Sequence, residues 1–435
     1  MANIIDIFLQ ITKISRCSFK TEKMREFLMQ KSKEYGYIVE VDKSGNILAK
    51  KGNPKICFQA HYDMVCVGDA PKIEPIIEGN ILRAKNSSLG ADNGIAIAMM
   101  LKLMQEGAEA EFLFTNDEEV GLIGAANLNL NVSSPYMLNL DSEDEKEVFI
   151  GCAGGIDLKL SKELEDLEVN GDFYELSINN LPGGHSGVDI DKNIANAIVE
   201  LAKYINKYGL KVVSFNGGER INSIPANAKA IVASKKELSS SDIVSVKKLN
   251  NTFEVTNFNI KDLLNMPNGV IEFNKEFNVV ESSANLALVN INNNHANIEL
   301  SLRSLDNKKL DDLANSIKLN YQDLGYKVEL NDKYPGWKPE INEFTKLVES
   351  AVKKIYGSCE TKVIHAGLEC GLLSKKLPNI KIASIGPNIR YPHSIREYVE
   401  IDSVYKTFDV VKEVLARVWI LSFSFKALFT FTVIF

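Results

Sequence analysis

Several acidic residues and one histidine stand where short apolar runs of the sequence end or small residues cluster, and side chains of these types can bind a divalent metal. The residues are His61, Asp92, Glu118, Glu119 and Asp141. Strands that end at the same edge of an α/β sheet bring such residues together, because that edge is where these proteins build their sites. Nitrogen and oxygen donors of this kind suit an ion such as zinc or manganese. The pattern therefore predicts a metal site.

Each motif also has a simpler interpretation when it is taken alone. His61 could be a structural histidine, and Asp92 could cap a helix predicted over residues 93–104. Glu118 and Glu119 could form a solvated acidic turn. Their joint occurrence at several strand ends of one domain favours the metal site over separate coincidences.

The acidic residues at and next to these positions could have separate roles in a metal site: orienting a ligand, binding metal and transferring protons. Asp63 follows His61 by two residues on an extended segment, so both side chains point to the same face. Asp63 could therefore accept the second ring N–H of His61 and fix its tautomer. Of the adjacent Glu118 and Glu119, one could bind metal while the other moves protons.

The composition is that of a globular protein with no nucleic-acid partner. The chain has 435 residues, which suggests two or three domains, with 45% hydrophobic and 25% charged residues. The net charge is −7, and Lys and Arg are scattered, so no basic binding surface is expected. The six cysteines form no CxxC pair. We interpret them as reduced thiols in a cytoplasmic protein and expect no disulfide framework.

The order of predicted elements indicates one domain inserted into another. The fold class is α/β: a catalytic domain with a mixed, mostly parallel sheet flanked by helices, and an inserted α+β lid domain. The predicted parts are residues 1–154, the insertion 155–335, residues 336–417 and an atypical hydrophobic tail 418–435. Strands are predicted over 56–60, 111–115, 136–140, 172–178, 210–215, 226–233, 269–273, 284–291, 296–302, 326–331 and 380–385, and helices over 93–104, 191–206, 241–252, 307–323, 342–356, 367–376 and 401–417.

The hydrophobic tail 418–435 has three interpretations. It could be a read-through or altered-frame product, a segment that docks or contacts another copy, or a membrane anchor. Eighteen residues is the short limit for a membrane span, and Lys426 would lie near its centre. Insertion of a central lysine costs about 3 kcal/mol, so we expect no membrane partner.

The motifs HYD, GADNG, NDEE, GCAGG, GGHSG, YPGW, HAGLECG and PHS occur in this order between residues 61 and 394. In this order the chain resembles the dizinc exopeptidases of the aminoacylase/carboxypeptidase type. Within them it is most similar to the bacterial cytosol non-specific dipeptidases, also called Xaa-His or beta-alanyl-histidine dipeptidases. The resemblance runs from about residue 5 to residue 417. The hydrophobic tail does not belong to it.

The resemblance implies a role for each site residue. Two divalent ions, zinc with manganese or cobalt as alternatives, would be held by His61, Asp92, Glu119, Asp141 and His393, with Asp92 between them. Glu118 would be the general base, Asp63 would orient His61, and His185 would stabilise the oxyanion. The implied substrate-binding residues are Arg303, Asn222, Glu369 and His365. Glu369 is the candidate for the substrate's free ammonium group, although it could equally be a helix N-terminal acid.

The implied function is metal-dependent hydrolysis of dipeptides by a metal-bridging hydroxide, with broad or Xaa-His specificity, in the cytoplasm. An N-acyl amino acid deacylase or amidase of the same family is the alternative, since it would share every ligand and Arg303. A non-catalytic relative would have lost a ligand or the base, whereas Glu118 and all five ligand positions are present. The lid is shorter than expected for this branch, and a homodimer is possible.

Overall fold

The chain divides into two compact units in the computed structural model, which describes residues 3–169, 171–292 and 294–430, with side chains as far as Trp419. The first unit comprises Met1–Gly151, Pro339–Val363 and Leu368–Phe435. The second comprises Cys152–Lys338 and the short segment Ile364–Gly367. One long stretch of chain and one short segment therefore interrupt the first unit.

The first unit is built on an eight-stranded sheet of order β1-β2-β6-β3-β7-β23-β8-β22. Its central strands run parallel from β6 through β3 and β7 to β23, while β1, β2 and β8 run antiparallel to their neighbours. Every residue of β3, β6 and β7 is buried, which explains why these strands are apolar runs in the sequence. The strands are β1 (Ile38–Val41), β2 (Ile47–Lys50), β3 (Ile56–His61), β6 (Glu111–Thr115), β7 (Tyr136–Asn139), β8 (Glu147–Cys152), β22 (Glu360–Ile364) and β23 (Lys381–Ser384).

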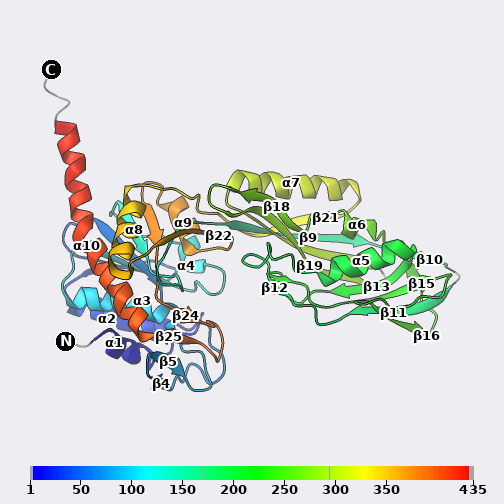
Figure 1. The fold of residues 1–435 in the computed structure, drawn as a ribbon, viewed down its shortest axis with the longest axis horizontal. Helices are drawn as coiled ribbons and strands as arrows, with labels where there is room; N and C mark the ends of the chain where they lie inside the picture. The colour runs from blue at the N-terminus through cyan, green and yellow to red at the C-terminus, as the bar shows by residue number, and fades with distance from the viewer. Residues whose placement is uncertain (1–2, 170, 293, 431–435) are drawn as a thin grey trace. The chain divides into compact units, whose positions relative to one another are not determined.

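Helices and a small sheet complete the first unit. Helix α3 packs against β3 and α1, and helices α8 and α10 pack against one another (Figure 1). Capping boxes begin α1 at Asn3 and α8 at Asn342, which satisfies backbone N–H groups that a helix start leaves open. The helices are α1 (Ile4–Ile11), α2 (Glu22–Glu34), α3 (Ala91–Gln105), α4 (Ile123–Ala126), α8 (Glu343–Tyr356), α9 (Glu369–Lys376) and α10 (Ile401–Thr430), and the small sheet has the order β24 (Ile389–Arg390), β25 (Tyr398–Glu400), β5 (Ile81–Ala84), β4 (Pro75–Glu78).

The second unit is a nine-stranded sheet with two long helices. Its neighbouring strands pair antiparallel, and apolar residues of α5 and α7 join the sheet in one hydrophobic core. The strands lie in the order β16 (Ser245–Leu249), β11 (Asp172–Ile178), β15 (Ala228–Ser234), β13 (Lys211–Gly217), β19 (Val279–Asn292), β20 (His295–Ser304), β9 (Gly154–Glu163), β21 (Lys327–Tyr334), with β18 (Gly269–Asn274) on β19. The helices are α5 (Ala197–Tyr208), α6 (Lys261–Leu264) and α7 (Asn307–Asp323), and short strand pairs join β10 (Asp166–Leu167) to β17 (Val255–Thr256) and β12 (Gly184–His185) to β14 (Ser223–Ile224).

The predicted helix over residues 241–252 is wrong. This segment contains strand β16, which pairs antiparallel with β11. Ser241 closes a turn before this strand: its hydroxyl accepts the N–H of Val244, and its own N–H donates to the Val244 carbonyl. Tertiary pairing along β11 therefore outweighs the local capping signal.

The expectation of no disulfide is also wrong. Cys17 and Cys66 form a disulfide, although 49 residues separate them in sequence. The backbone of Cys17 forms a β-bridge with Met64, and the two cysteine Cα atoms lie 5.5 Å apart. Only the fold brings them into this range, which is the usual one for a disulfide.

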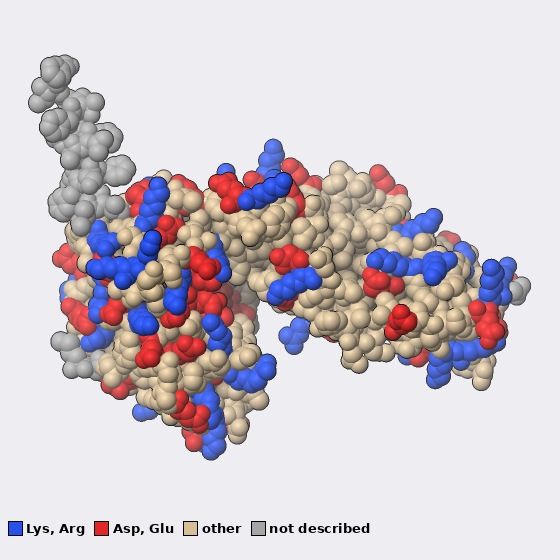
Figure 2. Space-filling model, viewed as in Figure 1, with Lys and Arg blue, Asp and Glu red and all other residues tan. Residues whose placement is uncertain are grey.

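The last helix is longer than predicted. Helix α10 continues from Ile401 to Thr430 instead of ending at residue 417. The side chains of residues 420–430 and the whole of residues 431–435 lie outside the described part, and so does most of the tail prediction. Within the described part of the chain, no helix has both the length and the apolar character that a membrane crossing requires. On the face shown in Figure 2, Lys and Arg side chains are interspersed with Asp and Glu.

Candidate metal centre

The five predicted metal ligands come together in the first unit. His61 is the last residue of β3, Asp141 lies two residues beyond β7, and Glu119 lies in the turn after β6. Asp92 is at the N-terminal end of α3, and His393 lies between β24 and β25. Because β3, β6 and β7 are parallel neighbours, their ends deliver these side chains to one sheet edge.

Asp92 is shared between two groups of donors. Its Oδ1 atom lies 3.1 Å from His61 Nε2, which in turn lies 3.4 Å from Asp141 Oδ1. Its Oδ2 atom lies 3.0 Å from His393 Nε2, which lies 2.9 Å from Glu119 Oε2. Within each group the donor atoms all lie within 4.8 Å of one another. One carboxylate oxygen for each group is the arrangement of a bridging ligand.

The chemistry of these donors fits two divalent ions. His61 is almost fully buried, and Glu119 Oε1 is buried with no hydrogen-bond partner. Buried carboxylates this close repel one another unless cations or protons lie between them. Each group combines one imidazole nitrogen with carboxylate oxygens, the donor set of zinc and similar ions.

The neighbouring carboxylates favour the protonated form of both histidines when no metal is bound. Burial opposes the charge on His393, but Asp92 and Glu119 outweigh it and raise the pKa of His393 to about 11. Burial likewise opposes the charge on His61, yet Asp141, Asp63 and Asp92 raise its pKa well above the ordinary value. A metal ion at either position therefore competes with a proton.

Asp63 contacts three parts of the site. Its Oδ1 atom lies 3.3 Å from His61 Nδ1, the ring nitrogen that faces away from Asp92. Its carboxylate also accepts the hydroxyl of Ser18 at 2.8 Å and the backbone N–H groups of Glu118 and Glu119 at 3.0 and 3.3 Å. Asp63 thus holds the turn that carries the two glutamates and places a carboxylate oxygen next to the His61 ring.

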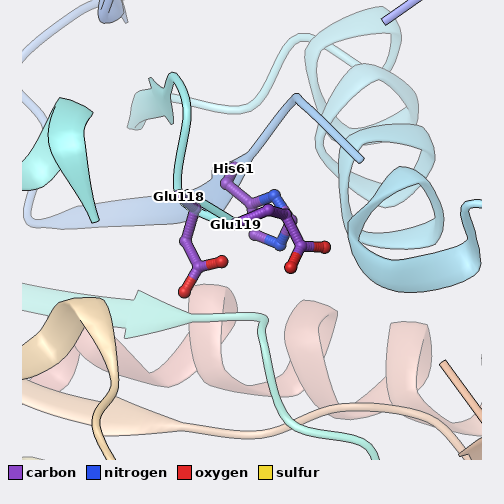
Figure 3. A group of neighbouring side chains, drawn as sticks. All are labelled: His61, Glu118 and Glu119. Atoms are coloured by element: carbon purple, nitrogen blue, oxygen red, sulfur yellow. The ribbon is translucent and has the colours of Figure 1, made fainter. Parts of the chain in front are cut away.

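Glu118 and Glu119 leave the same turn in different directions (Figure 3). Glu119 belongs to the donor group with His393, whereas a Glu118 oxygen lies within 4.8 Å of donor atoms of His61 and Glu119. Burial, with help from the carboxylates of Asp141, Glu119 and Glu369, raises the pKa of Glu118 well above its ordinary value. A raised pKa makes a carboxylate a stronger proton acceptor, which is what a general base requires.

Glu369 lies fully buried in the first unit at the start of α9. Its Oε2 atom accepts the Gln59 amide and the Thr115 hydroxyl, both at 2.7 Å, whereas Oε1 is buried with no partner. Burial raises the pKa of Glu369 to about 7. Its position in the first turn of α9 agrees with the interpretation as a helix N-terminal acid, and Oε1 remains an acceptor without a partner.

His185 belongs to the second unit and has a defined tautomer. Its Nδ1 atom accepts backbone N–H groups of Gly187 and Val188 at 3.1 and 3.2 Å, so the ring proton must be on Nε2. Burial and the charge of Arg303 lower the pKa of His185. The ring is therefore a neutral Nε2–H donor.

Arg303 and His365 also lie in the second unit. Arg303 is buried, donates from Nη1 to the Tyr334 hydroxyl at 2.7 Å, and has an unpartnered Nε. His365 Nε2 lies 2.7 Å from the Ser283 hydroxyl, and burial followed by the Arg303 charge lowers its pKa to about 3. The result is one cation beside a neutral imidazole, a setting suited to an anion.

Asn222 contacts the segment that carries His185 through its backbone carbonyl. Its carbonyl accepts the N–H of Ser186 at 2.9 Å, next to His185, and the residue is exposed. The described second unit therefore contains His185, Asn222, Arg303 and His365, and the first unit contains all other predicted site residues.

Residues that support the ligands were missed from the sequence. The Asn93 amide donates to the Asp141 carboxylate and to the Leu140 carbonyl, and Ser18 donates to Asp63. Arg16 and Glu397 contact the backbone of the site at several points. The position of Asn93 beside Asp92 offered a signal, but Ser18, Arg16 and Glu397 act over long sequence distances that no local pattern encodes.

Comparisons with known proteins agree with this geometry. The family model "Peptidase family M20/M25/M40" matches residues 57–417. The cytosol non-specific dipeptidase of Escherichia coli (strain K12) is 32% identical over 474 residues, which cover 95% of this chain and 97% of that protein.

Solved structures show the same fold. The aminoacylhistidine dipeptidase from Vibrio alginolyticus matches with a TM-score of 0.83 and 29% identity, over 95% of this chain and 96% of that one. The aminopeptidase PepT from Bacillus cereus matches with a TM-score of 0.60 and 18% identity, over 95% and 98% of the two chains. The match over residues 57–417 and the 32% identity show that this chain belongs to peptidase family M20/M25/M40, whose members hydrolyse peptide bonds.

Proposed function

We propose that the protein is a metal-dependent dipeptidase of broad specificity. The observation that carries this proposal is the Asp92 carboxylate, whose two oxygens each face a separate imidazole-containing donor group near the half-buried Glu118. The names of two relatives, a non-specific dipeptidase and an aminoacylhistidine dipeptidase, support the substrate class.

The ligand assignment follows from the two donor groups. His61 and Asp141 would hold one ion, Glu119 and His393 the other, and Asp92 both. We propose zinc, with manganese or cobalt as alternatives. Bound divalent ions supply Lewis acidity, which polarises a scissile carbonyl and acidifies water.

Glu118 acts as the general base in this proposal. Its raised pKa suits a carboxylate that takes a proton from the attacking water and returns it to the leaving amine. Asp63 keeps both His61 and the Glu118 backbone in place through the contacts described above. In this proposal the Asp63 carboxylate thus positions both the base Glu118 and the metal ligand His61.

The remaining predicted site residues would act on the substrate. His185 donates its Nε2–H to the developing oxyanion, a contribution whose loss typically costs roughly 3 kcal/mol of barrier. Arg303, with its free Nε, takes the substrate's carboxylate, supported by His365 and Asn222. The unpartnered Oε1 of Glu369 takes the free ammonium group. In this proposal the second unit, predicted over residues 155–335, is a lid domain.

A substrate panel with metal analysis tests the function. Purified protein loaded with zinc, manganese or cobalt should hydrolyse free dipeptides, including Xaa-His, and should leave the matched N-acetylated dipeptides intact. Preference for the N-acetylated set would instead identify a deacylase and remove the role of Glu369. Protein that binds none of these metals would contradict both.

Location and assembly are separate proposals. We infer a cytoplasmic location from the relative named as a cytosol dipeptidase. Cell fractionation tests it. A homodimer is a prediction from the sequence, and light scattering of the purified protein tests it.

A further inference from the structure

Glu397 holds the loop that carries the shared ligand Asp92. Its carboxylate accepts the N–H groups of four consecutive residues: Oε2 accepts those of Leu89 and Gly90 at 2.7 and 2.9 Å, and Oε1 those of Ala91 and Asp92 at 2.7 and 3.3 Å. Glu397 is only 2% exposed. The four N–H donors lie at the start of α3. There Asp92 departs from helical geometry, with a ψ of 110°.

Arg16 ties the same loop to the segment that carries His61. Its Nη1 atom donates to the carbonyls of Tyr62 and Asp63 at 3.3 and 2.8 Å, and its Nη2 atom donates to the carbonyl of Gly90. Arg16 is 1% exposed. One guanidinium group therefore joins two stretches of backbone that precede or follow metal ligands.

The loop is shaped to admit this cation. A Cβ atom built on Gly90 would lie 2.5 Å from Arg16 Nη2, and one built on Gly94 would lie 2.6 Å from it. Gly90 also has a φ of 70°, a conformation that side chains rarely adopt. The two glycines of the GADNG motif thus leave space for the Arg16 guanidinium next to the loop that carries Asp92.

The charges of the two side chains are complementary. Burial disfavours a charged Arg16, and Glu397 is the strongest of the carboxylates that offset this, followed by Asp63, Asp92 and Glu119. Burying opposite charges is costly and often gives no net stability compared with apolar residues. The presence of both charges next to the loop that carries Asp92 is explained if they fix the geometry of that loop.

We propose that Arg16 and Glu397 are positioning residues that hold the Asp92 carboxylate where it can face two ions at once. They touch neither substrate nor metal, and act through the Leu89–Asp92 backbone. The proposal rests on the proposed function, since it requires a pair of metal ions. Its specific consequence is that the loss of either residue weakens the paired binding of metal.

Manganese binding by folded protein tests this proposal. Glu397→Gln and Arg16→Met are compared with wild type and with Glu78→Gln and Arg83→Lys, which alter an exposed ion pair of the same unit. Calorimetric titration gives the affinity, electron paramagnetic resonance distinguishes exchange-coupled from isolated Mn²⁺, and thermal unfolding of the metal-free protein reports the fold. We expect 10- to 100-fold weaker binding and loss of the coupled signal in the two test variants, as is typical for groups that support metal ligands, and no change in the controls.

Unchanged affinity and an unchanged coupled signal in folded Glu397→Gln or Arg16→Met would overturn the proposal, because they would leave the pair a merely structural role. If these variants do not fold, Glu397→Asp and Arg16→Lys replace them. Both keep the charge but shorten or narrow the contacts, so full metal affinity in them would count equally against the proposal. Wild-type protein that binds no pair of manganese, zinc or cobalt ions would overturn the proposed function as well, whereas paired Mn²⁺ in every variant overturns this proposal alone.

Discussion

His61 Nε2 lies 3.1 Å from Asp92 Oδ1, and the other oxygen of Asp92 faces His393. Because both donor groups depend on this carboxylate, Asp92→Asn should disrupt both ion sites. An amide offers one neutral oxygen in place of two charged ones, so metal content should fall below two ions per chain. Elemental analysis after desalting measures this, with the exposed Asp172→Asn as control. Two retained ions would show that Asp92 does not bridge.

Glu118→Gln should separate catalysis from metal binding. Glu118 lies outside the two donor groups that share Asp92, so both ions should remain, while kcat should fall about 10²- to 10⁴-fold because the base is lost. Steady-state kinetics with elemental analysis measures both quantities. Glu119→Gln is the matched contrast and should lose metal as well as activity. Full turnover by metal-loaded Glu118→Gln would exclude its role as base.

Metal affinity should rise with pH. In the metal-free protein the pKa of His393 is raised to about 11 and that of His61 is raised well above its ordinary value, so both rings are protonated at neutral pH. Each must lose its proton to bind metal, so binding releases protons and strengthens as pH increases. Calorimetry in buffers of different ionisation enthalpy counts the protons. Binding without proton release, and with no dependence on pH, would contradict this account of the two histidines.

Arg303→Lys should raise KM for dipeptides more than it lowers kcat. Lysine cannot offer a planar pair of donors to a carboxylate, and one charge-assisted hydrogen bond is worth about 1.5–3 kcal/mol, or roughly 10- to 150-fold in kcat/KM. Dipeptide amides, which lack the carboxylate, should be hydrolysed equally by wild type and variant. An equal loss on both substrate sets would argue for a structural role of Arg303, as in its contact with Tyr334.

A count of reactive thiols with and without reductant should reveal the disulfide. Of the six cysteines, Cys57, Cys152, Cys359 and Cys370 lie outside the disulfide, so protein denatured without reductant should react at four thiols and at six after reduction. Closing a loop between residues 49 apart stabilises by about 4 kcal/mol at most, so Cys17→Ser should lower the free energy of unfolding by up to that amount. Six reactive thiols without reductant would show that the two cysteines are adjacent but unbonded, as a reducing cytoplasm favours.

The sequence was informative wherever a buried strand appears as a continuous apolar run. Strands β3, β6 and β7 are buried on both faces, so their apolar runs and the polar residues at their ends could be predicted directly. The five proposed ligands and Glu118 followed from this pattern together with the family resemblance, and the structure brings them together.

The features that were missed depend on contacts between distant segments. Strand β16 forms because β11 supplies a partner, although Ser241 locally favours a helix start. Glu397 contacts Leu89 and Cys17 contacts Cys66 only after the chain has folded. No spacing rule connects such residues, because their separation in sequence has no fixed relation to their separation in space.

Anomalous diffraction from crystals grown with Mn²⁺ or Zn²⁺ tests the central claim most directly. The account predicts two peaks in the first unit, one on each side of the Asp92 carboxylate, with His61 and Asp141 around one and Glu119 and His393 around the other. A single peak, or peaks that Asp92 does not join, would contradict it.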